Sequence, residues 1–261
     1  MVDDRPLSSF PSRSRMPCQI CRAPTRNVLT KEQNVSCGDY FEGRRLYPQD
    51  RGALQLMECV SCGFARFDGM DRWSAEEFRQ HIYNADYHLC DQPFLGARPR
   101  KLAAWLAAAL PRQRLVDYGG GEGMMAALLR DAGFDALSFD PFYGDHAAPV
   151  GTSPVVTAFE VVEHVPDQRG LFRTLMELCE PSGMIIFSTL LKAPELKGDW
   201  WYASPRNGHV SFHSAQSLQL LMDELGLSCR SLTSEMHVAA RDPSVLAITE
   251  GWPAIAVNDS L

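Results

Sequence analysis

The chain has 261 residues, 45% of them hydrophobic, which is enough for one large globular domain and a small one. A formal net charge of −7 argues against a large nucleic-acid-binding face, which needs an excess of Lys and Arg. No apolar run reaches the length of a membrane span, and residues 1–15 lack the apolar core of a secretory signal. We therefore expect a disordered tail over 1–15 and a cytosolic protein without a membrane partner.

Two C-x-x-C pairs occur in the first part of the chain, Cys18–Cys21 and Cys59–Cys62. Each pair can form a knuckle whose thiolates converge on one metal, and four soft ligands suit tetrahedral zinc in a closed, structural site. A redox C-x-x-C would not explain two copies, and four unrelated reduced cysteines explain neither spacing. Cys37 lacks a partner at knuckle spacing. We expect a zinc-binding module over residues 16–70, with a strand over 50–58 leading into the second knuckle.

Residues 71–100 read as a connecting segment. Ser74 and Glu77 predict a short helix with a capping box, in which each residue hydrogen-bonds to the backbone of the other. An aromatic stretch around Tyr87 follows, and then an Ala/Leu-rich helix from Lys101 to Leu110.

A glycine-rich turn then organises the rest of the chain. An apolar run ends at Asp117 and is followed by Gly119, Gly121 and Gly123 before a helix-like segment, which is typical of the first βα unit of a nucleotide-binding sheet. Asp140 ends the next apolar run, where a carboxylate can bind ribose hydroxyls. The turn alone fits both the dinucleotide pattern G-x-G-x-x-A and a second pattern, D-x-G-x-G-x-G.

Strand-like and helix-like stretches alternate from here to the end of the chain. We expect strands near 114–118, 135–140, 155–160 and 183–189, with two last strands near 227–235 and 244–249, and helices near 122–132, 168–180 and 215–225. This alternation predicts an α/β fold, a doubly wound, Rossmann-like and mainly parallel sheet over residues 101–261, next to the small N-terminal zinc-binding domain.

The text over roughly residues 98–250 resembles class I S-adenosylmethionine (SAM)-dependent methyltransferases of the small-molecule group. The resemblance rests on the D-x-G-x-G-x-G turn and on E-V-x-E-H-x-x-D from Glu160 to Asp167. It implies that Asp117, Gly119, Gly121 and Gly123 hold the methionine part of SAM and that Asp140 holds the ribose. It also places Glu160 near the cofactor and Tyr87 over it as a lid. The N-terminal zinc-binding segment resembles one seen in some bacterial methyltransferases.

An insertion over residues 199–214 follows the fifth strand, at the carboxyl edge where ligands bind in open α/β sheets. Transfer to oxygen or nitrogen can need a base, and the candidates are His164, His209, His213 and Glu163. The alternative is that these histidines only pack. Trp200, Trp201 and Tyr202 suit a planar or sugar face, or serve as buried anchors.

The resulting hypothesis is a SAM-dependent methyltransferase that acts on a small molecule, a sugar or a secondary metabolite. Three rivals stay open: an RNA methyltransferase that grips RNA with its zinc module, a noncatalytic SAM-fold interaction protein, and an NAD enzyme. The sequence identifies neither the acceptor atom nor the role of Cys37 nor the oligomeric state.

Overall fold

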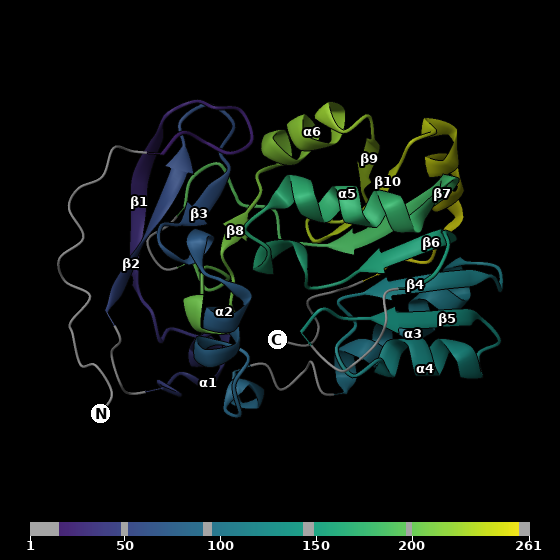
Figure 1. The fold of residues 1–261 in the computed structure, drawn as a ribbon, viewed down its shortest axis with the longest axis horizontal. Helices are drawn as coiled ribbons and strands as arrows, with labels where there is room; N and C mark the ends of the chain where they lie inside the picture. The colour runs from purple at the N-terminus through teal and green to yellow at the C-terminus, as the bar shows by residue number, and fades with distance from the viewer. Residues whose placement is uncertain (1–15, 48–51, 91–95, 143–148, 197–199, 256–261) are drawn as a thin grey trace.

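The computed structural model describes residues 16–47, 52–90, 96–142, 149–196 and 200–255, so the predicted tail over 1–15 lies outside the described residues. Two sheets dominate the fold (Figure 1): a four-stranded sheet in the order β1-β2-β3-β8 and a six-stranded sheet in the order β5-β4-β6-β7-β10-β9. The described residues contain no helix long and apolar enough to span a bilayer.

The four-stranded sheet is antiparallel and combines three N-terminal strands with one strand from much later in the chain. It comprises β1 (Thr25–Glu32), β2 (Ala53–Cys59), β3 (Ala65–Phe67) and β8 (Ser211–Phe212). The strand predicted over 50–58 is β2, and helix α1 (Cys37–Glu42) lies between β1 and β2. Strand β8 comes from the insertion and pairs with β3, with Ala65 opposite Phe212. The N-terminal module is therefore completed by a segment far away in the sequence.

Helix α2 (Ala75–His81) connects the module to the larger sheet and begins as predicted. Its N-cap Ser74 accepts a hydrogen bond from the Glu77 amide, and the Glu77 carboxylate accepts one from the Ser74 amide. The next helix, α3 (Ala97–Ala109), begins before the predicted start at Lys101.

The six-stranded sheet confirms the predicted doubly wound architecture. Its four parallel strands are β4 (Arg114–Tyr118), β5 (Asp135–Phe139), β6 (Ser153–Ala158) and β7 (Cys179–Ser188). Strand β10 (Met236–Ala240) runs antiparallel to both of its neighbours, β7 and β9 (Ser228–Ser231). Helices α5 (Gln168–Leu178) and α6 (Ala215–Glu224) pack on one face, and α3 and α4 (Met124–Asp131) on the other.

The end of the chain differs from the prediction. The strand expected over 244–249 is wrong, because Pro243–Gly251 forms a 3-10 helix capped by the Asp242 side chain, which accepts a hydrogen bond from the Ser244 amide. Pro243 has no N–H to donate to a sheet ladder, and it is favoured in the first turn of a helix. The strand expected near 227–235 is β9, which ends at Ser231, and the last strand of the described residues is β10, which lies after that span.

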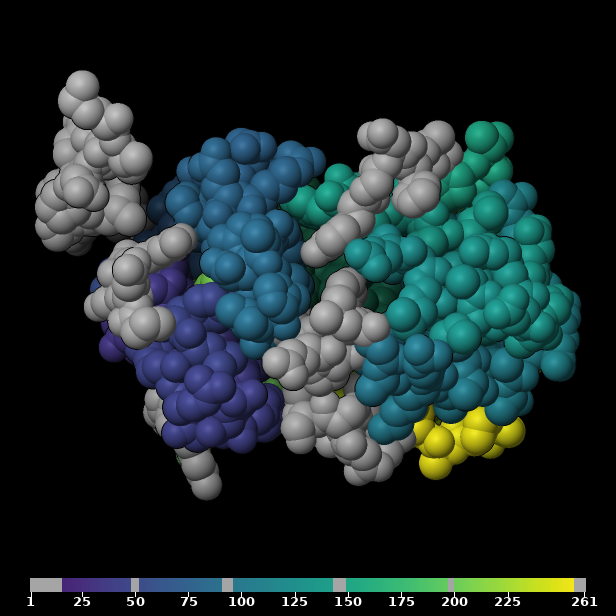
Figure 2. Space-filling view, turned by 90° about the horizontal axis from the view of Figure 1, so that it is seen from below, coloured from purple at the N-terminus to yellow at the C-terminus, as the bar shows by residue number. Residues whose placement is uncertain are grey.

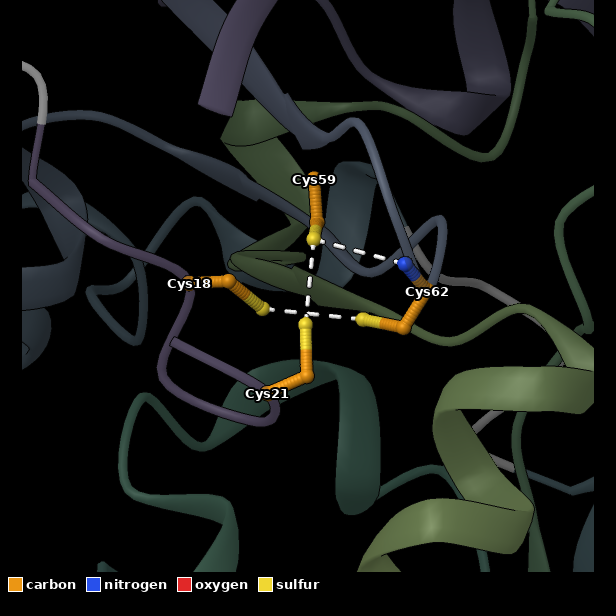
Figure 3. Close-up of side chains that lie close together, drawn as sticks. All are labelled: Cys18, Cys21, Cys59 and Cys62. Atoms are coloured by element: carbon orange, nitrogen blue, oxygen red, sulfur yellow. Dashed lines mark hydrogen bonds between the residues drawn. The ribbon is translucent and has the colours of Figure 1, made fainter. Parts of the chain in front are cut away.

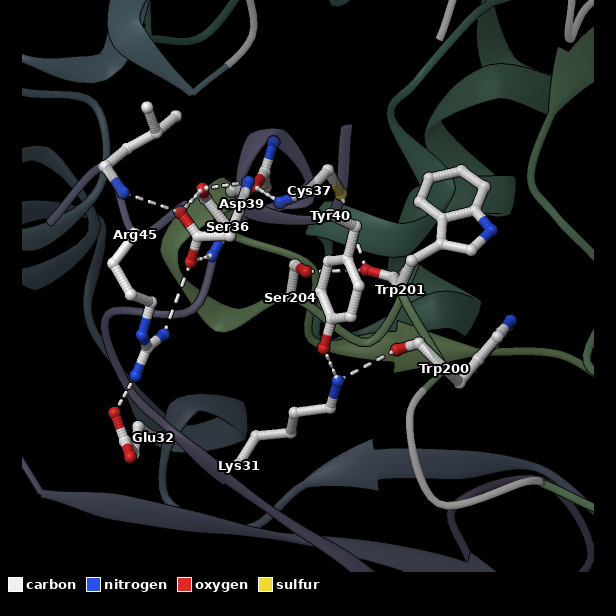
Figure 4. A network of polar contacts seen from close by, with 12 residues as sticks. Lys31, Glu32, Ser36, Cys37, Asp39, Tyr40, Arg45, Trp200, Trp201 and Ser204 are labelled. Carbon is white, nitrogen blue, oxygen red and sulfur yellow. Dashed lines mark hydrogen bonds and ion pairs between the residues drawn. The ribbon is translucent and has the colours of Figure 1, made fainter. Parts of the chain in front are cut away.

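The N-terminal module holds the insertion through buried polar contacts (Figure 4). The Lys31 ammonium donates to the Tyr40 hydroxyl and, at 3.1 Å, to the carbonyl of Trp200. The Lys192 side chain, which is 1% exposed, also forms an ion pair with Glu58 of β2, with 2.8 Å between the ammonium nitrogen and a carboxylate oxygen. A buried charge is costly unless it is paired, so these contacts fix the two parts of the chain to each other.

Candidate active site and metal centre

The glycine turn follows β4 at the carboxyl edge of the large sheet. Gly119 has φ +76°, and a Cβ there would lie 2.4 Å from the Val161 side chain. A Cβ at Gly120 would lie 2.3 Å from an Asp117 carboxyl oxygen. Gly123, with φ +77°, is the N-cap of α4. Glycine is needed here both for backbone conformation and for close packing against the loop after β6.

Two acids flank the turn, and both are almost completely buried. Asp117 accepts a hydrogen bond from the Thr157 hydroxyl at 2.8 Å, and burial raises the pKa of Asp117 to about 7. Asp140 accepts one from the Gly121 amide at 2.9 Å and another from the Phe142 amide at 2.8 Å. Gly121 thus acts through Asp140, whose carboxylate fixes the turn.

A pocket opens beside this turn. Figure 2 shows a hollow between the blue surface near residue 80 and the teal surface of the larger sheet unit. The pocket is lined by residues 117–120, 140–142, 159–161 and 164–165, and by Tyr83, Tyr87, Arg98, Pro99, Leu102 and Met125. Five of the residues predicted to contact the cofactor therefore share one cavity: Asp117, Gly119, Asp140, Glu160 and Tyr87.

Glu160 and Tyr87 are each held in place by the surrounding structure. Glu160 has φ +54°, which is unusual for a residue other than glycine. Its amide donates to the Ser188 hydroxyl at 2.7 Å, and that hydroxyl donates to its carboxylate at 2.8 Å. Tyr87 is buried and donates its hydroxyl to the carbonyl of Asn207 in the insertion at 3.4 Å.

His164 lines the same pocket and lies in the 3-10 helix Val162–His164, in the loop after β6. Its Nδ1 is 3.2 Å from the Tyr83 hydroxyl, and its ring is 4.9 Å from that of His209. Burial, with His209 and Arg98 nearby, holds the pKa of His164 well below its usual range. The imidazole is thus neutral at physiological pH and can accept a proton.

Glu163 and His209 adjoin His164. Burial raises the pKa of Glu163 well above its usual range, so this carboxyl group favours its neutral form. His209 Nδ1 lies 2.7 Å from the carbonyl oxygen of Tyr202, which can only accept, so Nδ1 carries the proton and Nε2 is an acceptor. The ligand atoms of Glu163, His164 and His209 lie within 4.8 Å of one another, a spacing that could hold a divalent cation.

His213 lies outside the pocket lining, and both of its ring nitrogens have partners. Its Nε2 is 3.0 Å from the Gln168 carbonyl oxygen and its Nδ1 is 3.1 Å from the Ser217 hydroxyl. Burial lowers the pKa of His213 to about 3. Trp200 and Tyr202 do not face the pocket, because they pack in the core of the N-terminal module with Phe212. Of the insertion, Gly208 and His209 lie against His164.

The four cysteines of the two knuckles converge (Figure 3). The Cys18 and Cys62 sulfurs are 3.6 Å apart and the Cys21 and Cys59 sulfurs 3.3 Å apart. Zn–S bonds of about 2.3 Å place tetrahedral sulfurs roughly 3.8 Å apart, so the donor set fits structural zinc with little movement. Cys37 lies elsewhere, at the start of α1, with its sulfur 3.7 Å from the carbonyl oxygen of Trp201.

Three residues of the site were missed by sequence reasoning: Tyr83 and Arg98, which line the pocket, and Gln168, which contacts its loop. Tyr83 lies in the same aromatic stretch as Tyr87, and Arg98 precedes an apolar helix shortly before the glycine turn. These two sequence positions could have suggested that Tyr83 and Arg98 lie near the pocket. Gln168 follows the helix N-cap Asp167 and carries no signal of its own.

Comparison with known proteins gives a consistent family. A model of the methyltransferase domain family matches residues 94–232. The ubiquinone biosynthesis O-methyltransferase of Bordetella avium is 30% identical over 115 residues, which cover 34% of this chain and 48% of that protein. The enzyme of the same name from Vibrio campbellii is 51% identical over 91 residues, covering 33% and 39%. This chain thus matches less than half the length of either curated relative.

Among solved structures, human N-acetylserotonin methyltransferase in complex with SAM superposes with a TM-score of 0.49 at 17% identity, covering 65% of this chain and 60% of that one.

Proposed function

Because the chain belongs to the methyltransferase domain family, we propose that it transfers a methyl group from SAM to a hydroxyl oxygen of a small molecule, a sugar or a secondary metabolite. The observation that carries the proposal is one pocket lined by a glycine turn, a buried acid, Asp140, and a neutral imidazole, His164. The curated relatives are named as O-methyltransferases of ubiquinone biosynthesis, which supports oxygen as the acceptor atom.

The cofactor side of the pocket suits the parts of SAM. Asp140 lines the cavity, and a carboxylate there is an acceptor suited to ribose hydroxyls. Gly119 and Gly120 let a ligand approach the backbone closely. Arg98 offers a guanidinium group that suits a carboxylate such as that of the methionine part. When bound, SAM supplies an electrophilic methyl group on a positively charged sulfur.

The acceptor side supplies a base. The hydroxyl oxygen forms a bond to the methyl carbon, the carbon–sulfur bond breaks, and S-adenosylhomocysteine leaves as a neutral thioether. His164 takes the proton of the hydroxyl and becomes an imidazolium, while Tyr83 holds the orientation of its ring. His209, whose Nε2 is an acceptor, is the second candidate for this role. Alignment of the two reactants in a dry pocket provides the rest of the rate.

The test separates binding from chemistry. Calorimetry with SAM and with NAD should give binding for SAM alone, and pools of hydroxylated metabolites incubated with methyl-labelled SAM identify the acceptor. His164→Gln should then lower turnover by ~10²–10⁴-fold with SAM affinity near normal. His237→Gln is the control, because His237 is also buried but hydrogen-bonds to the Ser231 hydroxyl and the Thr189 carbonyl, neither of which lines the pocket. Binding of NAD in place of SAM would overturn the proposal.

A further inference from the structure

We propose that Gln168 and His213 are positioning residues that join the four-cysteine centre to the His164 loop, residues 162–165, so that the fold around the metal sets the geometry of the acceptor side of the pocket. The four-cysteine centre comprises Cys18, Cys21, Cys59 and Cys62. The functional half of this inference rests on the proposed methyl transfer at His164, whereas the structural half does not.

Gln168 holds the His164 loop directly. Its amide nitrogen donates to the carbonyl of Val162 at 2.8 Å and to that of Val165 at 2.5 Å. Both amide hydrogens are thereby used, so the amide oxygen must face His213, and His213 Nε2 donates to it at 3.0 Å. Nδ1 is then the unprotonated nitrogen, 3.1 Å from the Ser217 hydroxyl oxygen. Gln168 and His213 are fully buried, which makes each of these bonds costly to lose.

The sequence neighbours of these two residues bind the two knuckles. Arg169, next to Gln168, donates to the carbonyl of Ile20 in the first knuckle at 2.9 Å and also to that of Gln19. Ser214, next to His213, donates to the carbonyl of Cys62 in the second knuckle at 2.5 Å. The His213 ring also contacts the ring of Phe64, with centroids 5.0 Å apart. The first knuckle is therefore hydrogen-bonded to the residue next to Gln168, and the second knuckle to the residue next to His213.

A second connection runs through the four-stranded sheet. Strand β3, which follows the second knuckle, pairs with β8 of the insertion. The amide before β8, that of Val210, donates to the carbonyl of Glu163 at 2.7 Å, and the Ser211 hydroxyl donates to that of Val165 at 2.9 Å. Three carbonyls of the His164 loop are thus bound by Gln168, Val210 and Ser211, all of which are anchored to the knuckles. Movement of the knuckles must move the loop.

The experiment compares two histidines in matched surroundings. His213 and His237 are both fully buried, each bonds a serine hydroxyl and an oxygen acceptor, and each contacts a phenylalanine ring. In His213→Phe, we expect hydrogen–deuterium exchange of the amides of residues 161–165 and of Val210 to be about tenfold or more faster than in the wild type. His237→Phe should leave exchange there unchanged.

The metal arm uses Cys21→Ser, checked for zinc loss by elemental analysis, because a chelator would also strip any cation from other sites. This variant should show faster exchange over the same residues, while exchange over 117–123 and SAM affinity by calorimetry stay near those of the wild type. Failure of the wild type to bind SAM would refute the proposed function and leave the exchange comparison intact.

Equal exchange over 161–165 in His213→Phe and His237→Phe would overturn the inference, and so would zinc loss in Cys21→Ser without faster exchange there. If His213→Phe does not fold, Gln168→Met keeps the length of the side chain, removes the bonds of Gln168 to Val162, Val165 and His213, and is read by the same comparison with His237→Phe.

Discussion

Replacing Asp140 tests the cofactor site and the turn at once. The carboxylate, which is 9% exposed, accepts hydrogen bonds from the Gly121 and Phe142 amides. Hydrogen bonds to a charged acceptor contribute about 1.5–3 kcal/mol each, but the open pocket lets water replace part of that loss. We therefore expect Asp140→Ala to lower the free energy of unfolding by about 2–4 kcal/mol.

The same change should weaken SAM binding. Ribose hydroxyls lose their acceptor and the turn loses its fixed conformation, so we expect a loss of ~1–3 kcal/mol in binding free energy, or about 5- to 150-fold in affinity. Asp140→Asn keeps one acceptor oxygen and should lie between the wild type and the alanine variant in both quantities.

Guanidinium unfolding measures the first quantity and calorimetric titration the second. Asp135→Ala is the control, because Asp135 is exposed at the start of β5, and its change should stay within about 0.5 kcal/mol. Destabilisation with unaltered SAM affinity would remove Asp140 from the cofactor site. Unaltered stability would refute the reasoning about the two amides.

Three other changes give separate outcomes. Burial raises the pKa of Asp117 to about 7, so the folded state binds the Asp117 proton more tightly than the unfolded state does. The free energy of unfolding should therefore fall as pH rises from about 4 through 7. The melting temperature of Asp117→Asn should fall less steeply with pH than that of the wild type, and a steeper fall would contradict this. Lys192→Met strands the Glu58 carboxylate with only Arg26 at 3.3 Å and should cost about 3 kcal/mol in chemical unfolding, whereas no loss would mean that the ion pair is neutral for stability. The purified protein should hold one zinc per chain and Cys59→Ser should release it, because metal binding and folding of the knuckles are coupled; elemental analysis that finds no zinc in the wild type would disprove this.

Local signals made much of the fold predictable. The capping box at Ser74 and Glu77 and the glycine turn after Asp117 each depend on residues within one turn of each other. Such short-range rules hold regardless of what packs around them. The parallel order of the large sheet followed from alternation of strands and helices.

Long-range pairing was the part that the sequence did not reveal. The pattern offered His213 as a base, but its position beside Gln168 and Phe64 depends on β8 joining a sheet whose other strands lie far upstream. In the same way, Trp200 looked suited to a ligand, yet it packs against Phe212. No periodicity in a two-residue strand distinguishes these arrangements.

The pairing of β3 with β8 also determines the order in which the protein can be completed during synthesis. Ala65 and Phe67 of β3 are fully buried, but their partner strand is translated only after the whole parallel part of the large sheet has emerged. Until then the knuckles can close around metal while one edge of their sheet stays open, and open edges are prone to aggregation. A fragment that ends at residue 70 would keep that edge permanently, so we expect it to aggregate or to require Ser211 and Phe212 supplied as a peptide.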